Sequence, residues 1–96
     1  MQTYIILRRG GWRSPAALDA AAARSSVVGV HMSKEVRWLR SYVLEEGNGT
    51  VGTLCVFEAT SPEAVRRHAR LAELPVDEIV KVDETLLVHD VQAVAA

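Results

Sequence analysis

The sequence predicts an α+β fold in which two helices cover one face of a four-stranded antiparallel sheet. Two Ser-Pro pairs, Ser14-Pro15 and Ser61-Pro62, each precede a stretch in which apolar or small residues recur at helical spacing. The turn Gly47-Asn48-Gly49 separates two β-rich runs, as in a hairpin. One further β-rich run precedes the first helix and another follows the second helix. The predicted order is therefore β-α-β-β-α-β, in two halves of similar length.

The first half begins with the β-rich run Gln2 to Arg9, which ends at Gly10-Gly11. Ser14 is expected to cap a helix that extends to about Val30, with Pro15 at the first helical position, where a missing N–H costs nothing. The residues that recur at helical spacing in this stretch are mostly small. We therefore expect a weakly amphipathic helix.

The second half begins with a hairpin whose strands run from Val36 to Glu46 and from Val51 to Ala59. Ser61 then starts the second helix, and Glu63 lies near the positive end of its dipole. Pro75 stops this helix, because the residue before a proline is disfavoured in the helical conformation.

A last strand is expected from Ile79 to about Asp90, with a break at Asp83-Glu84. The residues after it, 91–96, are expected to form a flexible tail. The chain is therefore predicted to be a single domain over residues 1–90 with the ferredoxin-like arrangement of strands and helices.

Composition excludes several classes of function. The chain has 96 residues, a net charge of −1 and a single cysteine. This charge indicates no surface for nucleic acid, and no apolar run reaches the roughly 18 residues of a membrane span, so neither partner is expected. One thiol, together with an N-terminus that lacks the pattern of a signal peptide, predicts a cytoplasmic protein.

Strand alternation divides the strand residues between two faces of the sheet. Because the helices need a plain apolar surface, we expect beneath them Ile5, Leu7, Leu39, Val43, Leu54 and Val56. The open face would then carry Tyr4, Ile6, Arg8, Trp38, Arg40, Tyr42, Cys55 and Phe57. That face is too apolar to remain exposed on a small monomer, so the prediction is a homodimer whose second copy covers it in a barrel-like pairing.

The open face also offers a candidate site for a small molecule. An arginine on an apolar face needs an anionic partner, which is either a carboxylate of the other subunit or a ligand. The predicted ligand-binding residues are Arg8, Trp38, Arg40, Tyr42 and Cys55. The alternative is that this face serves dimerisation alone.

His68 and Glu58 are the candidate metal ligands. His68 lies on the inward stripe of the second helix, where it is a metal ligand, an acid or base, or a structural histidine bonded to backbone or to a carboxylate. Glu58 is expected on the helix-facing side of its strand and is the candidate carboxylate. Cys55 is able to ligate a soft metal, but the face assignment places it across the sheet from His68.

Four segments together resemble a known family: VRWLRSYV at 36–43, CVFEA at 55–59, SPEAVRRHA at 61–69 and LPVDEI at 74–79. The family is small, largely actinobacterial and of unassigned function, and it is similar to a nickel-binding, nickel-responsive ferredoxin-like protein. The resemblance covers Tyr4 to about Val82 and implies a ferredoxin-like homodimer. It also implies nickel as the metal to consider, with Cys55, Glu58 and His68 as the matching residues able to ligate it.

Three functions remain open from the sequence. The favoured hypothesis is a binding module for a small molecule or a metal ion. The second is a cofactor-free enzyme of the monooxygenase or isomerase type, which requires a cavity containing a titratable group such as His68 or Tyr42. The third is a structural protein that only dimerises.

Overall fold

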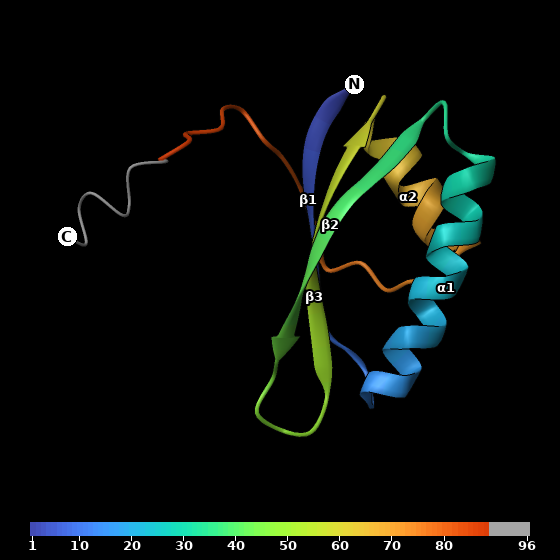
Figure 1. Ribbon diagram of the computed structural model, residues 1–96, viewed down its shortest axis with the longest axis vertical. Coiled ribbons are helices and arrows are strands. Elements are labelled where there is room, and N and C mark those ends of the chain that lie inside the picture. The colour runs from blue at the N-terminus through green and yellow to red at the C-terminus, as the bar shows by residue number, and fades with distance from the viewer. Residues whose placement is uncertain (89–96) are drawn as a thin grey trace.

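The computed structural model describes residues 1–88 (Figure 1). These residues form four strands and two helices in the predicted order. They are β1 (Gln2–Trp12), α1 (Pro15–His31), β2 (Val36–Glu45), β3 (Val51–Ala59), α2 (Pro62–Leu71) and β4 (Glu78–Lys81). The sheet is antiparallel with strand order β2-β3-β1-β4, and both helices lie on one of its faces (Figure 1). This arrangement confirms the predicted α+β fold. The expected tail at 91–96 lies outside the described residues.

Both helices begin after the serines that were predicted to cap them. The Ser14 hydroxyl oxygen accepts a hydrogen bond from the Ala17 N–H at 3.2 Å, and the Ser61 hydroxyl oxygen accepts one from the Ala64 N–H at 3.1 Å. Each cap satisfies a backbone donor that the first helical turn leaves without a partner. The two Ser-Pro pairs therefore fix where each helix leaves the sheet.

The register of the two central strands decides which side chains lie beneath the helices. In the antiparallel pair of β1 and β3, Tyr4 is opposite Phe57, Ile6 is opposite Cys55 and Arg8 is opposite Thr53. All six residues are buried. Residues opposite one another in an antiparallel pair point to the same face, so these three pairs form one continuous helix-facing row.

The expected face assignment was wrong for these two strands. Tyr4, Ile6, Arg8, Cys55 and Phe57 face the helices, whereas Ile5, Leu7, Leu54 and Val56 face the open side. From Tyr4 to Leu7, β1 has apolar residues on both of its faces. The hydrophobic pattern alone therefore does not determine which face of the strand packs against the helices. The arginine, which suggested an open face, is buried instead.

A bulge in β2 reverses the alternation of that strand. Trp38 pairs with Phe57, but Arg40 pairs with Val56, so Leu39 is an extra residue in the ladder. Trp38 therefore faces the helices, contrary to expectation, and Leu39 is exposed rather than beneath them. Beyond the bulge Val43 faces the helices as predicted, and Arg40 and Tyr42 face the open side as predicted.

The last strand is shorter than predicted. β4 covers only Glu78–Lys81, and residues 82–88 form no strand. The remainder of the expected strand, 89–90, lies outside the described residues. Within residues 1–88 no helix is both long and apolar enough to span a membrane.

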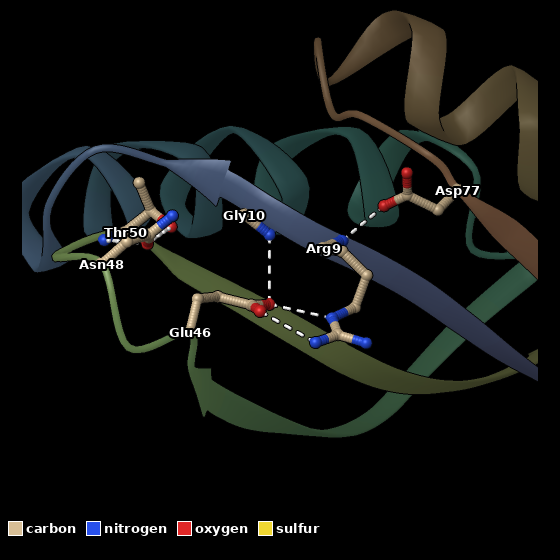
Figure 2. Close-up of polar contacts among 6 residues, drawn as sticks. All are labelled: Arg9, Gly10, Glu46, Asn48, Thr50 and Asp77. Atoms are coloured by element: carbon tan, nitrogen blue, oxygen red, sulfur yellow. Dashed lines mark hydrogen bonds and ion pairs between the residues drawn. The ribbon is translucent and has the colours of Figure 1, made fainter.

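An acidic side chain from the β2–β3 turn holds the end of β1 (Figure 2). The Glu46 carboxylate accepts two hydrogen bonds from the Arg9 guanidinium, both at 2.9 Å, and one from the Gly10 N–H at 3.1 Å. The hydrogen bonds from Arg9 hold the pKa of the Glu46 carboxyl below its usual value. On the other side, the Asp77 carboxylate accepts a hydrogen bond from the Arg9 backbone N–H. These contacts fix the strand at the residue that follows Arg8.

Two glycines give opposite predictions for stability. A Cβ at Gly52 would overlap the Arg8 carbonyl oxygen, whereas one at Gly29 in α1 would meet open space. We expect Gly52→Ala to lower the free energy of unfolding by about 1–3 kcal/mol through overpacking. Gly29→Ala should raise it by about 0.5–1 kcal/mol, because alanine favours the helix. Urea denaturation measures both, and an unchanged stability for Gly52→Ala would contradict the close approach of β1 and β3.

Candidate functional site

A cavity of about 170 Å³ lies between α1 and the helix-facing side of the sheet. The sheet contributes a row of polar and aromatic side chains from three neighbouring strands. Arg8 comes from β1, Thr53, Cys55 and Phe57 come from β3, and Trp38 and Ser41 come from β2. The register brings them together, since Arg8 pairs with Thr53 and Cys55 pairs with Ser41.

The small side chains of α1 leave the space that forms this cavity. Ala21, Ala22 and Ser25 line it, together with Leu18 one turn earlier. Ala21 and Ser25 are buried against the sheet, so the helix lies close to the strands without filling the volume between them. Larger side chains at these positions would occupy the cavity.

Aromatic rings form much of the apolar lining. The Trp38 and Phe57 rings are nearly parallel, with an interplanar angle of 5° and centroids 6.2 Å apart. The Trp38 indole N–H donates to the Ser41 hydroxyl oxygen at 2.8 Å, which orients the indole. Trp12 also lines the cavity, so both tryptophans of the chain do.

Arg8 is the most unusual residue of the lining. Its side chain extends into the core, and the residue is only 1% exposed. Its Nη1 donates to the Pro75 carbonyl oxygen at 2.6 Å. Within residues 1–88 no carboxylate oxygen lies within 4.0 Å of the guanidinium, so Arg8 forms no ion pair with the described chain. A buried cation of this kind is costly unless something pairs with it.

Cys55 and Thr53 add neutral polar groups beside Arg8. The Cys55 thiol donates to the Thr53 hydroxyl oxygen, with Sγ and Oγ1 separated by 3.4 Å. Both residues are buried. They supply polar atoms to the cavity without changing its charge.

His68 of α2 is buried next to the cavity but does not line it. Its Nε2–H donates to the Ser25 carbonyl oxygen at 3.2 Å, and its ring packs edge-on against Phe57, with centroids 5.1 Å apart. Burial lowers the pKa of His68, and the nearby Arg8 charge lowers it further, while the hydrogen bond to Ser25 opposes both. Burial therefore favours the neutral imidazole, which packs between Phe57 and the Ser25 carbonyl oxygen.

The structure divides the predicted ligand-binding residues between the two faces of the sheet. Arg8, Trp38 and Cys55 meet at the cavity. Arg40 and Tyr42 lie on the open face, where the Arg40 Nε donates to the Tyr42 hydroxyl oxygen at 3.1 Å. The predicted set of five therefore does not form one site.

The family described as "Nickel responsive protein SCO4226-like" matches residues 4–82 of this chain. The chain belongs to the SCO4226-like family. A comparison with curated proteins finds no match.

Two solved structures resemble the fold. The crystal structure of SCO4226 from Streptomyces coelicolor A3(2) has a TM-score of 0.68 and 24% identity, over 88% of this chain and 99% of that one. SnoaB, a cofactor-independent oxygenase from Streptomyces nogalater, has a TM-score of 0.50 and 17% identity, over 88% of this chain and 96% of that one. At these identities the likeness to each establishes the ferredoxin-like fold.

The candidate metal ligands of this SCO4226-like chain do not meet. Glu58 lies on the open face, where its carboxylate accepts a hydrogen bond from Arg37 at 3.3 Å, whereas His68 lies on the helix side. Their assignment to one metal was wrong. The expected separation of Cys55 from His68 was also wrong, since both lie on the helix side. Across residues 1–88 no three His, Cys, Asp or Glu side chains cluster, so the described chain does not by itself fit a nickel site.

Sequence reasoning missed Thr53, Ser41, Trp12 and the small residues of α1 as lining groups. The alanine-rich stretch after Ser14 is the signal that could have found the cavity, because a helix of small residues cannot fill the space above a sheet of large ones. The polar groups on the strands could be grouped only after the register was known.

The lowered pKa of His68 predicts a pH dependence of stability. The unfolded chain takes up a proton near pH 6.5 that the folded chain resists, so the free energy of unfolding should fall as pH decreases from about 7.5 to 5.5. The slope from one such group is at most about 1.4 kcal/mol per pH unit. His68→Gln should remove this contribution, whereas His31→Gln, at an exposed position, should retain it. Urea denaturation at each pH gives the slopes, and equal slopes in wild type and His68→Gln would refute the assignment.

Proposed function

We propose that this SCO4226-like protein binds a small aromatic molecule in the cavity between α1 and the sheet, and does so as a homodimer. The observation that carries the proposal is a largely apolar cavity of about 170 Å³ next to the parallel Trp38 and Phe57 rings, with few polar groups. Binding sites for small molecules are typically concave and apolar with a small number of placed polar groups.

Binding is favoured over catalysis by the positions of the acid–base candidates. His68 is next to the cavity but does not line it, and its Nε2 is engaged with the Ser25 carbonyl oxygen. Tyr42 lies on the opposite face of the sheet. A general acid or base must reach the reacting atom, and neither group extends into the cavity. The oxygenase SnoaB shares the fold, which by itself carries no activity to this chain.

The proposal assigns no role to nickel. The family description concerns a nickel response, and nickel favours several nitrogen or sulfur ligands in one place. The described residues bring no such group together, so we assign no step to the metal. The ligand proposed here is organic.

A second copy of the chain is the proposed occupant of the open face. Leu54 lies at its centre, flanked by Leu7 and Tyr42, and Tyr42 is 53% exposed. Arg40 on β2 and Glu78 on β4 place opposite charges at opposite edges of the same face. A two-fold interface presents the same patch twice, so a patch with an apolar centre and charges of both signs is suited to itself.

Filling the cavity should weaken binding without unfolding the chain. We expect para-nitrobenzyl alcohol to quench the fluorescence of Trp12 and Trp38 saturably, because both line the cavity. Ala22→Leu should weaken this binding at least about tenfold, since the larger side chain occupies the same space. Ala20→Leu, at an exposed position of the same helix, should leave it unchanged. Equal affinities for the two variants would contradict the location, and no saturable quenching in wild type would refute the proposed function.

The dimer is tested separately by sedimentation velocity. A charge at the centre of the open face should prevent pairing, so Leu54→Lys is expected to convert a dimer into a monomer. Leu71→Lys, at an exposed position on α2, should remain dimeric. A wild-type protein that sediments as a monomer at micromolar concentration would show that the second copy is the wrong occupant.

A further inference from the structure

We infer that the ligand of the cavity is an organic anion, a planar aromatic acid whose carboxylate pairs with Arg8. This inference rests on the proposed function and goes beyond it by assigning the charge and the shape of the ligand. It also assigns Arg8 as the residue that selects the ligand, an assignment that follows from its burial, its lack of an ion pair among residues 1–88 and its position in the cavity lining.

The acidic side chains around this part of β1 either accept hydrogen bonds from Arg9 or lie too far from Arg8 to pair with it. Glu46 accepts hydrogen bonds from the Arg9 side chain and Asp77 accepts one from the Arg9 backbone, at the surface end of β1 (Figure 2). Asp19 on α1 lines the cavity but is exposed and lies more than 4.0 Å from the Arg8 nitrogens. Among the described residues, the guanidinium thus has a backbone carbonyl as partner but no carboxylate.

A guanidinium carries five N–H donors in a planar fork that matches a carboxylate. The bond from Nη1 to the Pro75 carbonyl oxygen uses one of them and anchors the group to the loop that precedes β4. The remaining donors belong to a group that borders the cavity. A ligand carboxylate there would gain charge-assisted hydrogen bonds from a guanidinium that is itself buried.

The hydroxyls of the cavity are also placed as donors. Ser41 accepts from the Trp38 indole and Thr53 accepts from the Cys55 thiol, so in each case the hydroxyl hydrogen is left to donate. Arg8, Ser41 and Thr53 are thus three donor groups on the sheet side of one cavity. Three donor groups on one side of a cavity are complementary to an oxyanion rather than to a cation.

The rings determine the shape of the ligand. Trp38 and Phe57 are parallel to within 5°, and a flat ring stacks against such a surface better than a branched aliphatic group does. The volume of about 170 Å³ is suited to a single substituted ring rather than to a fused polycyclic system. A planar aromatic acid satisfies both the rings and the donors.

The pKa of His68 is sensitive to charge in the cavity. The charge of Arg8 contributes to lowering the pKa of His68, so the two groups are close enough to interact electrostatically. An anion seated on Arg8 would compensate that charge. It would therefore raise the pKa of His68, whereas a neutral ligand of the same shape would not do so by this route.

The test compares two probes of matched shape in three proteins. Para-nitrobenzoate should quench the tryptophans of the wild-type protein with at least about tenfold higher affinity than para-nitrobenzyl alcohol. Arg8→Met removes the charge and retains an unbranched side chain, and should abolish the preference for the acid. Arg70→Met, at an exposed position on α2, should retain it. Equal affinity for the two probes in wild type, or an unchanged preference in Arg8→Met, would overturn this inference while leaving the proposed function in place.

A measurement on the wild-type protein covers the case in which Arg8→Met does not fold. The pKa of His68, followed by the chemical shifts of its imidazole, should rise when the protein is saturated with para-nitrobenzoate and should not rise with the alcohol. No rise with the acid would overturn the assignment to Arg8. If neither probe binds, the proposed function fails, and this inference fails with it.

Discussion

The burial of the Arg8 charge beneath α1 is the constraint on which the rest of the structure depends. The register of β1 against β3 places Arg8 next to Thr53 on the helix side of the sheet. The contacts of Arg9 with Glu46 and Asp77 hold the strand at the next residue (Figure 2), so the side chain cannot turn outward without breaking them. A helix of large side chains packed on this position would leave no room for a counter-charge, whereas Ala21, Ala22 and Ser25 leave a cavity. The cation, the strand end that fixes it and the small-residue helix above it therefore act together.

The fold could be predicted from local signals, and the faces of the sheet could not. Ser14 and Ser61 act as caps as expected, and the glycine turn joins β2 to β3, because these features depend on residues close in sequence. The choice of face depends on long-range pairing. In Tyr4-Ile5-Ile6-Leu7 the residues on both faces of the strand are apolar, so the pattern is compatible with either orientation. Arg8, the polar residue that was assigned to the open face, is buried beneath the helices. The bulge at Leu39 then changes parity within β2, which strict alternation cannot represent.

Three residues of the candidate site were predicted from the sequence, but the face of the sheet on which they lie was not. Arg8, Trp38 and Cys55 were nominated from the sequence and do lie together, under the helices rather than on the open face. Arg40 and Tyr42 were grouped with them by parity, and the bulge at Leu39 separates them. His68 was expected as a metal ligand, as an acid or base, or as a structural histidine bonded to backbone, and its contact with the Ser25 carbonyl oxygen of α1 matches the last of these. The open face is apolar, as expected, but its apolar residues are Leu7, Leu54 and their neighbours rather than the predicted set. The argument for a dimer therefore still applies, with different residues.

A crystal structure of the protein grown with para-nitrobenzoate tests the central claim most directly, because it locates both the ligand and its charge. We predict density for the ligand between α1 and the sheet, beside Trp38, with its carboxylate oxygens at about 2.7–2.9 Å from the Arg8 guanidinium. Density for the ligand on the open face beside Arg40 and Tyr42, with Arg8 paired to a carboxylate of the protein itself, would contradict it.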